Sequence, residues 1–349
     1  MPALGMLVIP NWFILALYDL KPRGRLLLIK SLVVGKKQFS VNLIQGPLAG
    51  VSSAPFRKLT TRYSQPAFAC TEMISCKTLI HQSDDFLRRF IYKDPEEKTL
   101  CFQLSGTDPM ELSKAVSKAT QLGADLIDLN CGCPVKKIRS RGAGSRLLSQ
   151  PSRLYQLMIA MKQHTHLPVS IKIRVDGVSG DGFNRDIAKA VNDAGIDFLI
   201  VHGRHWDEHY ETACRYDEIA FFVNEVNVPV IGNGDVACES SLQQMLKTGC
   251  AGAMIARAGV GQPWLIRKLM ASMQGMAYQV PALKEIGAIF VEHIAGLAEL
   301  MGGEKFALLH ARALSKYYAK QVADKATFCL AVQHCESLAE FNQLVNKFY

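Results

Sequence analysis

Eight short apolar runs alternate with amphipathic stretches along this chain of 349 residues, and this repeat restricts the possible folds most strongly. Each run has four to six residues, mostly aliphatic or β-branched, as expected of a buried β-strand. The runs span residues 42–46, 67–71, 99–104, 125–129, 169–173, 198–201, 228–232 and 252–255. Eight βα units in about 220 residues predict an α/β fold, a (β/α)8 TIM barrel, whose usual size is about 250 residues.

The stretches between the runs have the apolar spacing of helices, as in residues 111–122 and 154–162. Pro109 marks a helix start, and Gly123 lies where that helix should end. A doubly wound sheet is the alternative, but it would need fewer strands and a glycine-rich first turn. The turn after the first run reads Pro47-Leu48-Ala49-Gly50.

The pattern divides the chain into three parts. Residues 36–278 hold the βα repeat, and residues 279–349 show helical spacing only, which predicts a C-terminal all-helical domain. Residues 1–35 are expected to be a disordered extension or to follow a mis-assigned start. Their apolar stretch, 4–18, is interrupted by Pro10 and Asn11 and is too short to span a membrane.

Composition adds two expectations. The chain has 40 Lys and Arg against 31 Asp and Glu, a formal charge of +9. This excess is compatible with a polyanionic partner, although many basic proteins bind none. The 10 cysteines lack the spacing of a disulfide scaffold, which indicates the reducing cytoplasm. No protein partner is evident, and we expect a monomer.

Polar side chains follow nearly every predicted strand, at the end where a barrel carries its active site. Unrelated loops would seldom all do so by chance, so together they predict one functional rim. The rim residues are Pro47, Leu48, Glu72, Gln103, Asn130, Cys133, Lys172, Arg174, His202, Asn233, Gly234, Asp235, Ala256 and Arg257.

Some of these positions suggest a bound anion. Lys172 alternates with apolar neighbours and should point into the barrel, where it either meets a ligand or pairs with a carboxylate. His202 either covers a cofactor or is a hydrogen-bonded core histidine. Residues 233–235 and 256–257 occupy the usual phosphate position of this fold, where the guanidinium of Arg257 would bind through two N–H groups.

The sharpest motif is Asn130-Cys131-Gly132-Cys133-Pro134, directly after the run 125–129. The C-x-C spacing has no second Cys or His pair nearby, so we predict no metal site. Such a thiol is either structural or a general acid, because a free cysteine with a pKa of about 8.5 is mostly protonated at neutral pH. Lys136, Lys137 and Arg139 follow, either as a solvated loop or as phosphate contacts, which beside the thiol suggests chemistry on a nucleic acid.

Together these residues resemble the tRNA-dihydrouridine synthases, most of all the bacterial B subfamily, over residues 34–349. The matching motifs are Gly46-Pro47-Leu48-Ala49-Gly50, Thr71-Glu72-Met73, Gln103-Leu104-Ser105-Gly106, Asp128-Leu129-Asn130-Cys131-Gly132-Cys133-Pro134, Lys172-Ile173-Arg174, His202-Gly203-Arg204, Asn233-Gly234-Asp235 and Ala256-Arg257. The resemblance implies an FMN-dependent barrel with a helical RNA-binding domain. Its reaction would reduce the 5,6 double bond of a uridine in the tRNA D-loop, with NADPH or NADH as a transient reductant.

The resemblance also implies roles for individual residues. Cys133 would donate the proton, and Asn130 would help to hold the uracil, which must leave its stack to react. FMN would be bound by Pro47, Leu48, Ala49, Gln103, Lys172, His202, Asn233, Gly234, Asp235, Ala256 and Arg257. Contacts with tRNA would come from Lys136, Lys137, Arg139, Arg174, Arg204 and Arg312.

Two other functions share parts of this pattern. A small-molecule FMN-dependent oxidoreductase of the pyrimidine or dihydroorotate type would keep the flavin residues, but it needs neither the basic loop nor the helical domain. A non-catalytic RNA-binding protein would result if Leu48 and Ala256 prevented flavin binding. These two residues replace the Met and Gly that are usual in the family.

Overall fold

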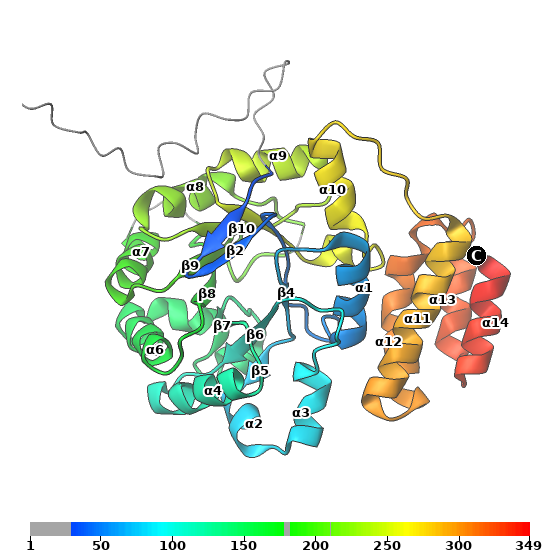
Figure 1. Ribbon diagram of the computed structural model, residues 1–349, viewed down its shortest axis with the longest axis horizontal. Coiled ribbons are helices and arrows are strands. Elements are labelled where there is room, and N and C mark those ends of the chain that lie inside the picture. Colours follow the sequence, from blue (N-terminus) through cyan, green and yellow to red (C-terminus); the bar gives the residue numbers. More distant parts are fainter. Residues whose placement is uncertain (1–28, 178–181, 210) are drawn as a thin grey trace, which may run out of the picture.

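A closed parallel barrel forms the centre of the computed structural model, which describes residues 29–177, 182–209 and 211–349 (Figure 1). In these residues eight strands close the barrel: β3 (Leu43–Gln45), β4 (Ala69–Cys70), β6 (Leu100–Ser105), β7 (Leu126–Cys131), β8 (Val169–Arg174), β9 (Phe198–His202), β10 (Val230–Asn233) and β11 (Gly252–Ile255). The ring closes because β4 pairs with both β3 and β6, and β5 (Ile74–Ser75) adds a short strand beside β6. Each predicted run overlaps a strand, so the (β/α)8 barrel is confirmed and the open doubly wound sheet is wrong.

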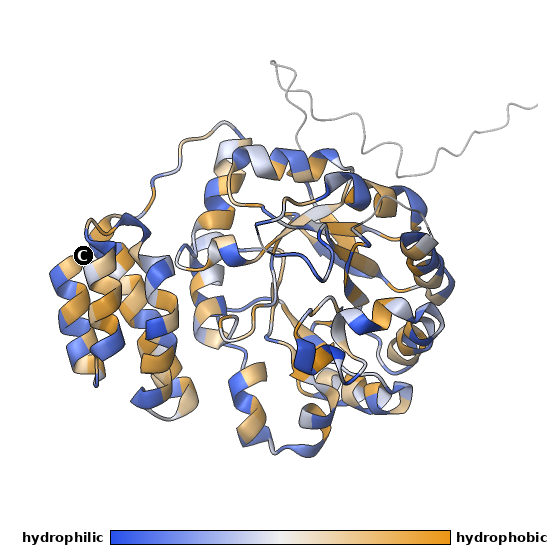
Figure 2. Cartoon of the chain, turned by 180° about the vertical axis from the view of Figure 1, so that it is seen from behind, coloured by the Kyte–Doolittle hydropathy of each residue, from blue (hydrophilic) through white to orange (hydrophobic). Residues whose placement is uncertain are grey.

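Helices surround the strands and continue into a separate C-terminal group. Around the barrel lie α1 (Ala54–Ser64), α2 (Cys76–His81), α3 (Asp84–Ile91), α4 (Pro109–Gln121), α5 (Lys136–Arg139), α6 (Pro151–Gln163), α7 (Gly182–Ala194), α8 (Tyr216–Glu225), α9 (Glu239–Lys247) and α10 (Leu265–Met273). The predicted ends of α4 are confirmed, since Asp108 accepts a hydrogen bond from the N–H of Glu111 at 2.9 Å and Gly123 has φ 85°. Figure 2 shows mostly hydrophobic barrel strands and helices that alternate between hydrophobic and hydrophilic residues.

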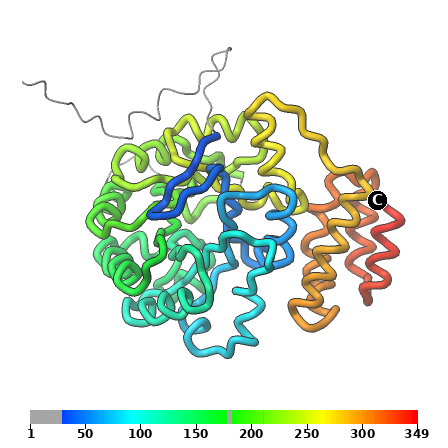
Figure 3. Tube along the Cα trace, viewed as in Figure 1, coloured from blue at the N-terminus to red at the C-terminus, as the bar shows by residue number. Residues whose placement is uncertain are grey.

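The interior of the barrel is apolar at the N-terminal end of the strands. A two-stranded hairpin, β1 (Leu32–Val34) and β2 (Lys37–Phe39), lies across this end and buries Leu32 and Val34 there (Figures 1 and 3). The apolar layer that it covers consists of Ile44, Ala67, Phe68, Cys70, Cys101, Leu126, Phe198, Ile200, Ile231 and Met254. The sequence did not predict this hairpin. Its first strand lies within residues 1–35, which were expected to be an extension, and is ordered because it packs on the end of the barrel. Residues 1–28 of that segment lie outside the described residues.

The C-terminal helices pack on one another and against the side of the barrel at α1 and α3 (Figure 3). They are α11 (Leu283–Met301), α12 (Glu304–Tyr318), α13 (Lys325–His334) and α14 (Leu338–Phe348). An ion pair of 2.7 Å between Arg62 of α1 and Glu292 of α11 joins the two parts, and the rings of Phe56 and His293 lie 5.9 Å apart. Within the described residues no helix has both the length and the apolar character needed to cross a membrane.

Candidate active site

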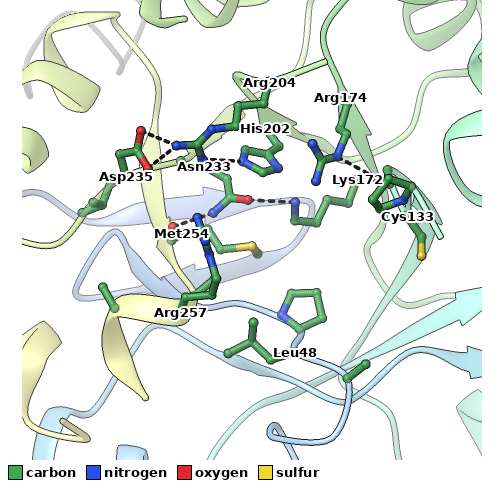
Figure 4. Close-up of a pocket in the computed structure, with 18 of the residues that line it drawn as sticks. Leu48, Cys133, Lys172, Arg174, His202, Arg204, Asn233, Asp235, Met254 and Arg257 are labelled. Carbon is green, nitrogen blue, oxygen red and sulfur yellow. Dashed lines mark hydrogen bonds and ion pairs between the residues drawn. The ribbon is translucent and has the colours of Figure 1, made fainter. Parts of the chain in front are cut away.

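A cavity of about 560 Å³ opens at the C-terminal ends of the barrel strands (Figure 4). Every residue that was expected to bind FMN lines it, together with Cys133, Asn130, Arg174 and Arg204. Figure 4 shows Cys133 on one side and Asp235 on the other, with Lys172 reaching toward Asn233 between them. The fold therefore gathers side chains from strands far apart in the sequence into one site.

A buried polar layer lies where the apolar interior ends. Gln103, Asp128 and Ser170 are neighbours in the register of β6, β7 and β8, and all three are buried. Asp128 accepts hydrogen bonds of 2.7 Å from the amide of Gln103 and from the hydroxyl of Ser170. Burial raises the pKa of Asp128 to about 7, although these two bonds and the charge of Lys172 act in the opposite direction.

Lys172 points into the barrel, as its alternation with apolar residues predicted. Its Nζ donates to Oδ1 of Asn233 at 2.8 Å, and the Nδ2 of Asn233 donates to the carbonyl of Met254 at 2.9 Å. Burial, followed by the charge of Arg174, lowers the pKa of Lys172 to about 8. Its hydrogen-bond partner is thus an amide, while the carboxyl group of Asp128 acts on it only through its charge.

The loop after β7 is held from two sides. Oδ1 of Asn130 accepts from the backbone N–H of Cys133 at 2.9 Å and of Gly132 at 3.2 Å. The Nε of Arg174 donates to the carbonyl of Gly132 at 2.9 Å. Cys131 is fully buried, and its burial raises the pKa of its thiol well above the usual value. Of the two thiols in the motif, only the partly exposed Cys133 lines the cavity.

The end of the cavity near His202 is positively charged. Burial, and then the charges of Lys172, Arg174, Arg204 and Arg257, hold the pKa of His202 well below its usual value. Its imidazole is therefore neutral at pH 7 and can donate or accept a hydrogen bond. Several cations around one cavity favour an anionic group, such as a phosphate.

The structure places Arg204 in a buried ion pair, whereas the sequence predicted that it contacts tRNA. It is 1% exposed, and its guanidinium forms an ion pair of 2.6 Å with Asp235. Asp235 also accepts from the backbone N–H of Cys214 at 3.0 Å and has a φ of 52°, in the left-handed region. Arg204 thus neutralises a carboxylate beside the proposed phosphate position, and its contact with tRNA stays a prediction.

Of the other predicted tRNA contacts, Arg174 lines the cavity, and the remaining four lie outside it. Lys136 and Lys137 are exposed in the first turn of α5. The guanidinium carbon of Arg139 lies 3.1 Å from the centroid of the Trp206 ring, which joins this turn to the loop after β9. Arg312 is partly buried and donates to the carbonyl of Cys335 at 3.1 Å. The two lysines are thus the members of this set that are clearly available to a large partner.

Some lining residues were not predicted as site residues. Tyr317 and Lys320 come from the C-terminal helices, and Met73 and Met254 come from the barrel. The rule that active-site residues follow barrel strands cannot find the first two, because they belong to a different part of the fold. Met254 lies within a strand, where its apolar side chain gives no functional signal.

The fold and the cavity define the class of this protein as a barrel enzyme. Its site lies at the C-terminal ends of the strands, carries a thiol and is suited to an anion. Residues 44–349 match the family model described as dihydrouridine synthase. A tRNA-dihydrouridine synthase B of Pseudomonas putida is 34% identical over 274 residues, covering 77% of this chain and 80% of the relative. One from Vibrio cholerae is 30% identical, covering 84% and 92%, and a probable tRNA-dihydrouridine synthase 1 of Synechocystis is 30% identical, covering 91% and 89%.

The chain belongs to the dihydrouridine synthase family. Among solved structures, a variant of NCR from Zymomonas mobilis superimposes with a TM-score of 0.51 at 13% identity. The similarity covers 74% of this chain and 94% of that one, and at this identity it supports the barrel fold alone.

Proposed function

We propose that this chain is a tRNA-dihydrouridine synthase, which reduces the 5,6 double bond of a uridine in the tRNA D-loop. The observation that carries the proposal is the position of Cys133 in the wall of the same cavity as Lys172 and Arg257. The reductant would be NADPH or NADH, visiting a bound FMN transiently. The names of the relatives support tRNA as the substrate.

The residues around the cavity fit FMN. Its volume, about 560 Å³, lies in the range of ordinary cofactor sites. Pro47, Leu48 and Ala49 give an apolar wall for a flat ring, and Gln103 and Lys172 supply donors at one edge. The phosphate would lie at the positive end, held by His202, Asn233, Gly234, Asp235, Ala256 and Arg257. A reduced flavin bound there supplies the hydride equivalent that uracil reduction needs.

The chain's own residues then have separable tasks. Lys172 places positive charge at the edge of the ring site, and its hydrogen bond to Asn233 fixes the direction of its ammonium group. Asn130 would hold the uracil, while its backbone contacts order the loop that carries the thiol. The Sγ–H of Cys133 would transfer its proton to C5 of the uracil, acting as a general acid.

The purified chain is expected to bind FMN, to show flavin absorbance and to form dihydrouridine in unmodified tRNA when reduced nicotinamide is added. Mass spectrometry of the digested tRNA measures the product and its position. Free uracil and dihydroorotate serve as comparison substrates. Turnover of either at the rate seen with tRNA would favour a small-molecule oxidoreductase. If the protein retains no flavin absorbance after FMN has been added and the unbound excess removed, the proposal is contradicted.

Replacing both Lys136 and Lys137 with alanine is expected to weaken tRNA binding and to make it less dependent on salt. Each lost phosphate contact should reduce the slope of log affinity against log salt by about 0.7 to 0.9. The pair Lys36 and Lys98, both exposed at the N-terminal end of the barrel and so at the end opposite the cavity, provides a charge-matched control double variant. An unchanged slope in the first variant would place the RNA on another surface.

A further inference from the structure

Asp128 is a buried carboxyl group of the cysteine motif for which the proposed reaction has no use. It lies within β7 and is 1% exposed. The strand register places it between Gln103 of β6 and Ser170 of β8. Its Oδ2 accepts from Nε2 of Gln103, and its Oδ1 accepts from Oγ of Ser170, each at 2.7 Å. Both oxygens are therefore used as acceptors inside the barrel.

A chain of hydrogen bonds continues from Asp128 to the thiol loop. Oε1 of Gln103 accepts from Nδ2 of Asn130 at 2.8 Å. Oδ1 of Asn130 accepts from the N–H of Cys133 at 2.9 Å and from that of Gly132 at 3.2 Å. The hydrogen bonds in this chain all have the same direction. The side-chain amides of Asn130 and Gln103 each accept a hydrogen bond from the side of the loop and donate one toward Asp128.

This order depends on its buried end. A side-chain amide can turn over and exchange its oxygen with its nitrogen, so its hydrogen-bond partners decide its orientation. Above its pKa of about 7, Asp128 is ionised and only accepts hydrogen bonds. Gln103 must then direct its NH2 group toward Asp128 and its oxygen toward Asn130. If Gln103 turned over, its oxygen would face a carboxylate oxygen and its NH2 group would face that of Asn130. Both contacts would be repulsive.

We propose that Asp128 is a positioning residue, which sets the orientation of two successive amides and thereby holds the Cys133 loop in place for proton transfer. Asp128 reaches the thiol loop through Gln103 and Asn130. Its catalytic consequence rests on the proposed function, whereas its structural consequence does not.

Amide hydrogen exchange of the purified full-length chain tests the structural part. In Asp128→Leu, which removes the acceptor at similar size, the N–H groups of Gly132 and Cys133 are expected to exchange about tenfold faster. Asp128→Asn should stay close to the unmodified chain, because its amide oxygen can face Gln103 while its NH2 group faces the oxygen of Ser170. Ser170→Ala, which spares the chain of amides, is the matched control and should also leave this exchange unchanged.

Unchanged exchange of these two N–H groups in Asp128→Leu would overturn the proposal, and so would equal acceleration in Asp128→Asn and Asp128→Leu. If Asp128→Leu fails to fold, Gln103→Met cuts the same chain one link further on and must show the same acceleration. In turnover, Asp128→Leu should lower kcat on the order of 10- to 100-fold with an unchanged KM for tRNA, and Asp128→Asn should restore it. If the unmodified chain forms no dihydrouridine, the proposed function fails, while the exchange result still decides the role of Asp128.

Discussion

Replacing Cys133 with alanine is expected to leave a chain that still binds FMN and tRNA but forms dihydrouridine on the order of 10²- to 10⁴-fold more slowly. The reason is that the variant loses the proposed proton donor in the cavity wall while the remaining wall residues are kept. The rate of a single turnover, measured with tRNA in excess and with the flavin reduced beforehand, isolates this step. Flavin absorbance and tRNA binding should change little.

Cys238 supplies a matched control for that experiment. It is also a free cysteine, and it is exposed at the start of α9. Its hydrogen bonds with Ser240 and Ser241 lower the pKa of its thiol to about 7. Cys238→Ala should therefore remove an acidic thiol that does not line the cavity, without loss of turnover. Full activity in Cys133→Ala would exclude Cys133 as the proton donor.

Replacing Arg57 with methionine is expected to reduce the free energy of unfolding by about 3 to 5 kcal/mol. Arg57 is fully buried, and its Nε lies 2.8 Å from the carboxylate of Glu97, which is also buried. Its other nitrogens donate to the carbonyl of Ser52 at 2.8 Å and to that of Tyr92 at 2.5 Å. The substitution would leave a buried carboxylate and two carbonyls without this partner.

Urea unfolding measures this loss, and the exposed Arg62 is the natural control. Arg62 pairs with Glu96 at 2.8 Å and with Glu292 at 2.7 Å, but its side chain is 38% exposed. Arg62→Met should therefore cost only about 0 to 1 kcal/mol. Adding Glu97→Gln to Arg57→Met should recover part of the loss, because it removes the buried charge. Equal losses in the two single variants would contradict the assignment of a buried pair.

The Arg57 variant should also affect the cavity. Ser52 ends a turn in which its backbone N–H donates to the carbonyl of Leu48 at 2.9 Å, and Leu48 lines the cavity wall. Because Arg57 holds the carbonyl of Ser52, its loss is expected to loosen the apolar wall proposed for the flavin ring. Weaker FMN binding at a temperature where the variant is still folded would support this link.

The sequence predicted the parts of the fold that repeat. The spacing and the length of the apolar runs were enough to locate all the barrel strands. The rule that barrel active sites lie at the C-terminal strand ends was enough to find residues such as Gln103, Lys172 and Arg257. The β1–β2 hairpin was missed because three-residue strands carry almost no periodic signal. The contributions of Tyr317 and Lys320 were missed because they depend on how the C-terminal helices pack against the barrel.

The role of Arg204 shows a different limit. Its place after a strand indicated a polar rim residue, which is correct, but its partner Asp235 comes from another strand end. A sequence gives the residue types at each loop but not which opposite charges will neutralise each other. The buried chain from Asp128 to Cys133 has the same origin, since Gln103 and Ser170 join it only through strand pairing.

The hairpin across the N-terminal end of the barrel has a consequence for the order of events. Together with the apolar layer beneath it, this hairpin closes the N-terminal end of the barrel, so that within the described residues the cavity opens at the C-terminal strand ends. Under the proposed function, reduced nicotinamide and the flipped-out base would have to use that opening by turns. The oxidised nicotinamide would have to leave before the base could enter. Reduction of the flavin and reduction of the uridine would therefore occur one after the other.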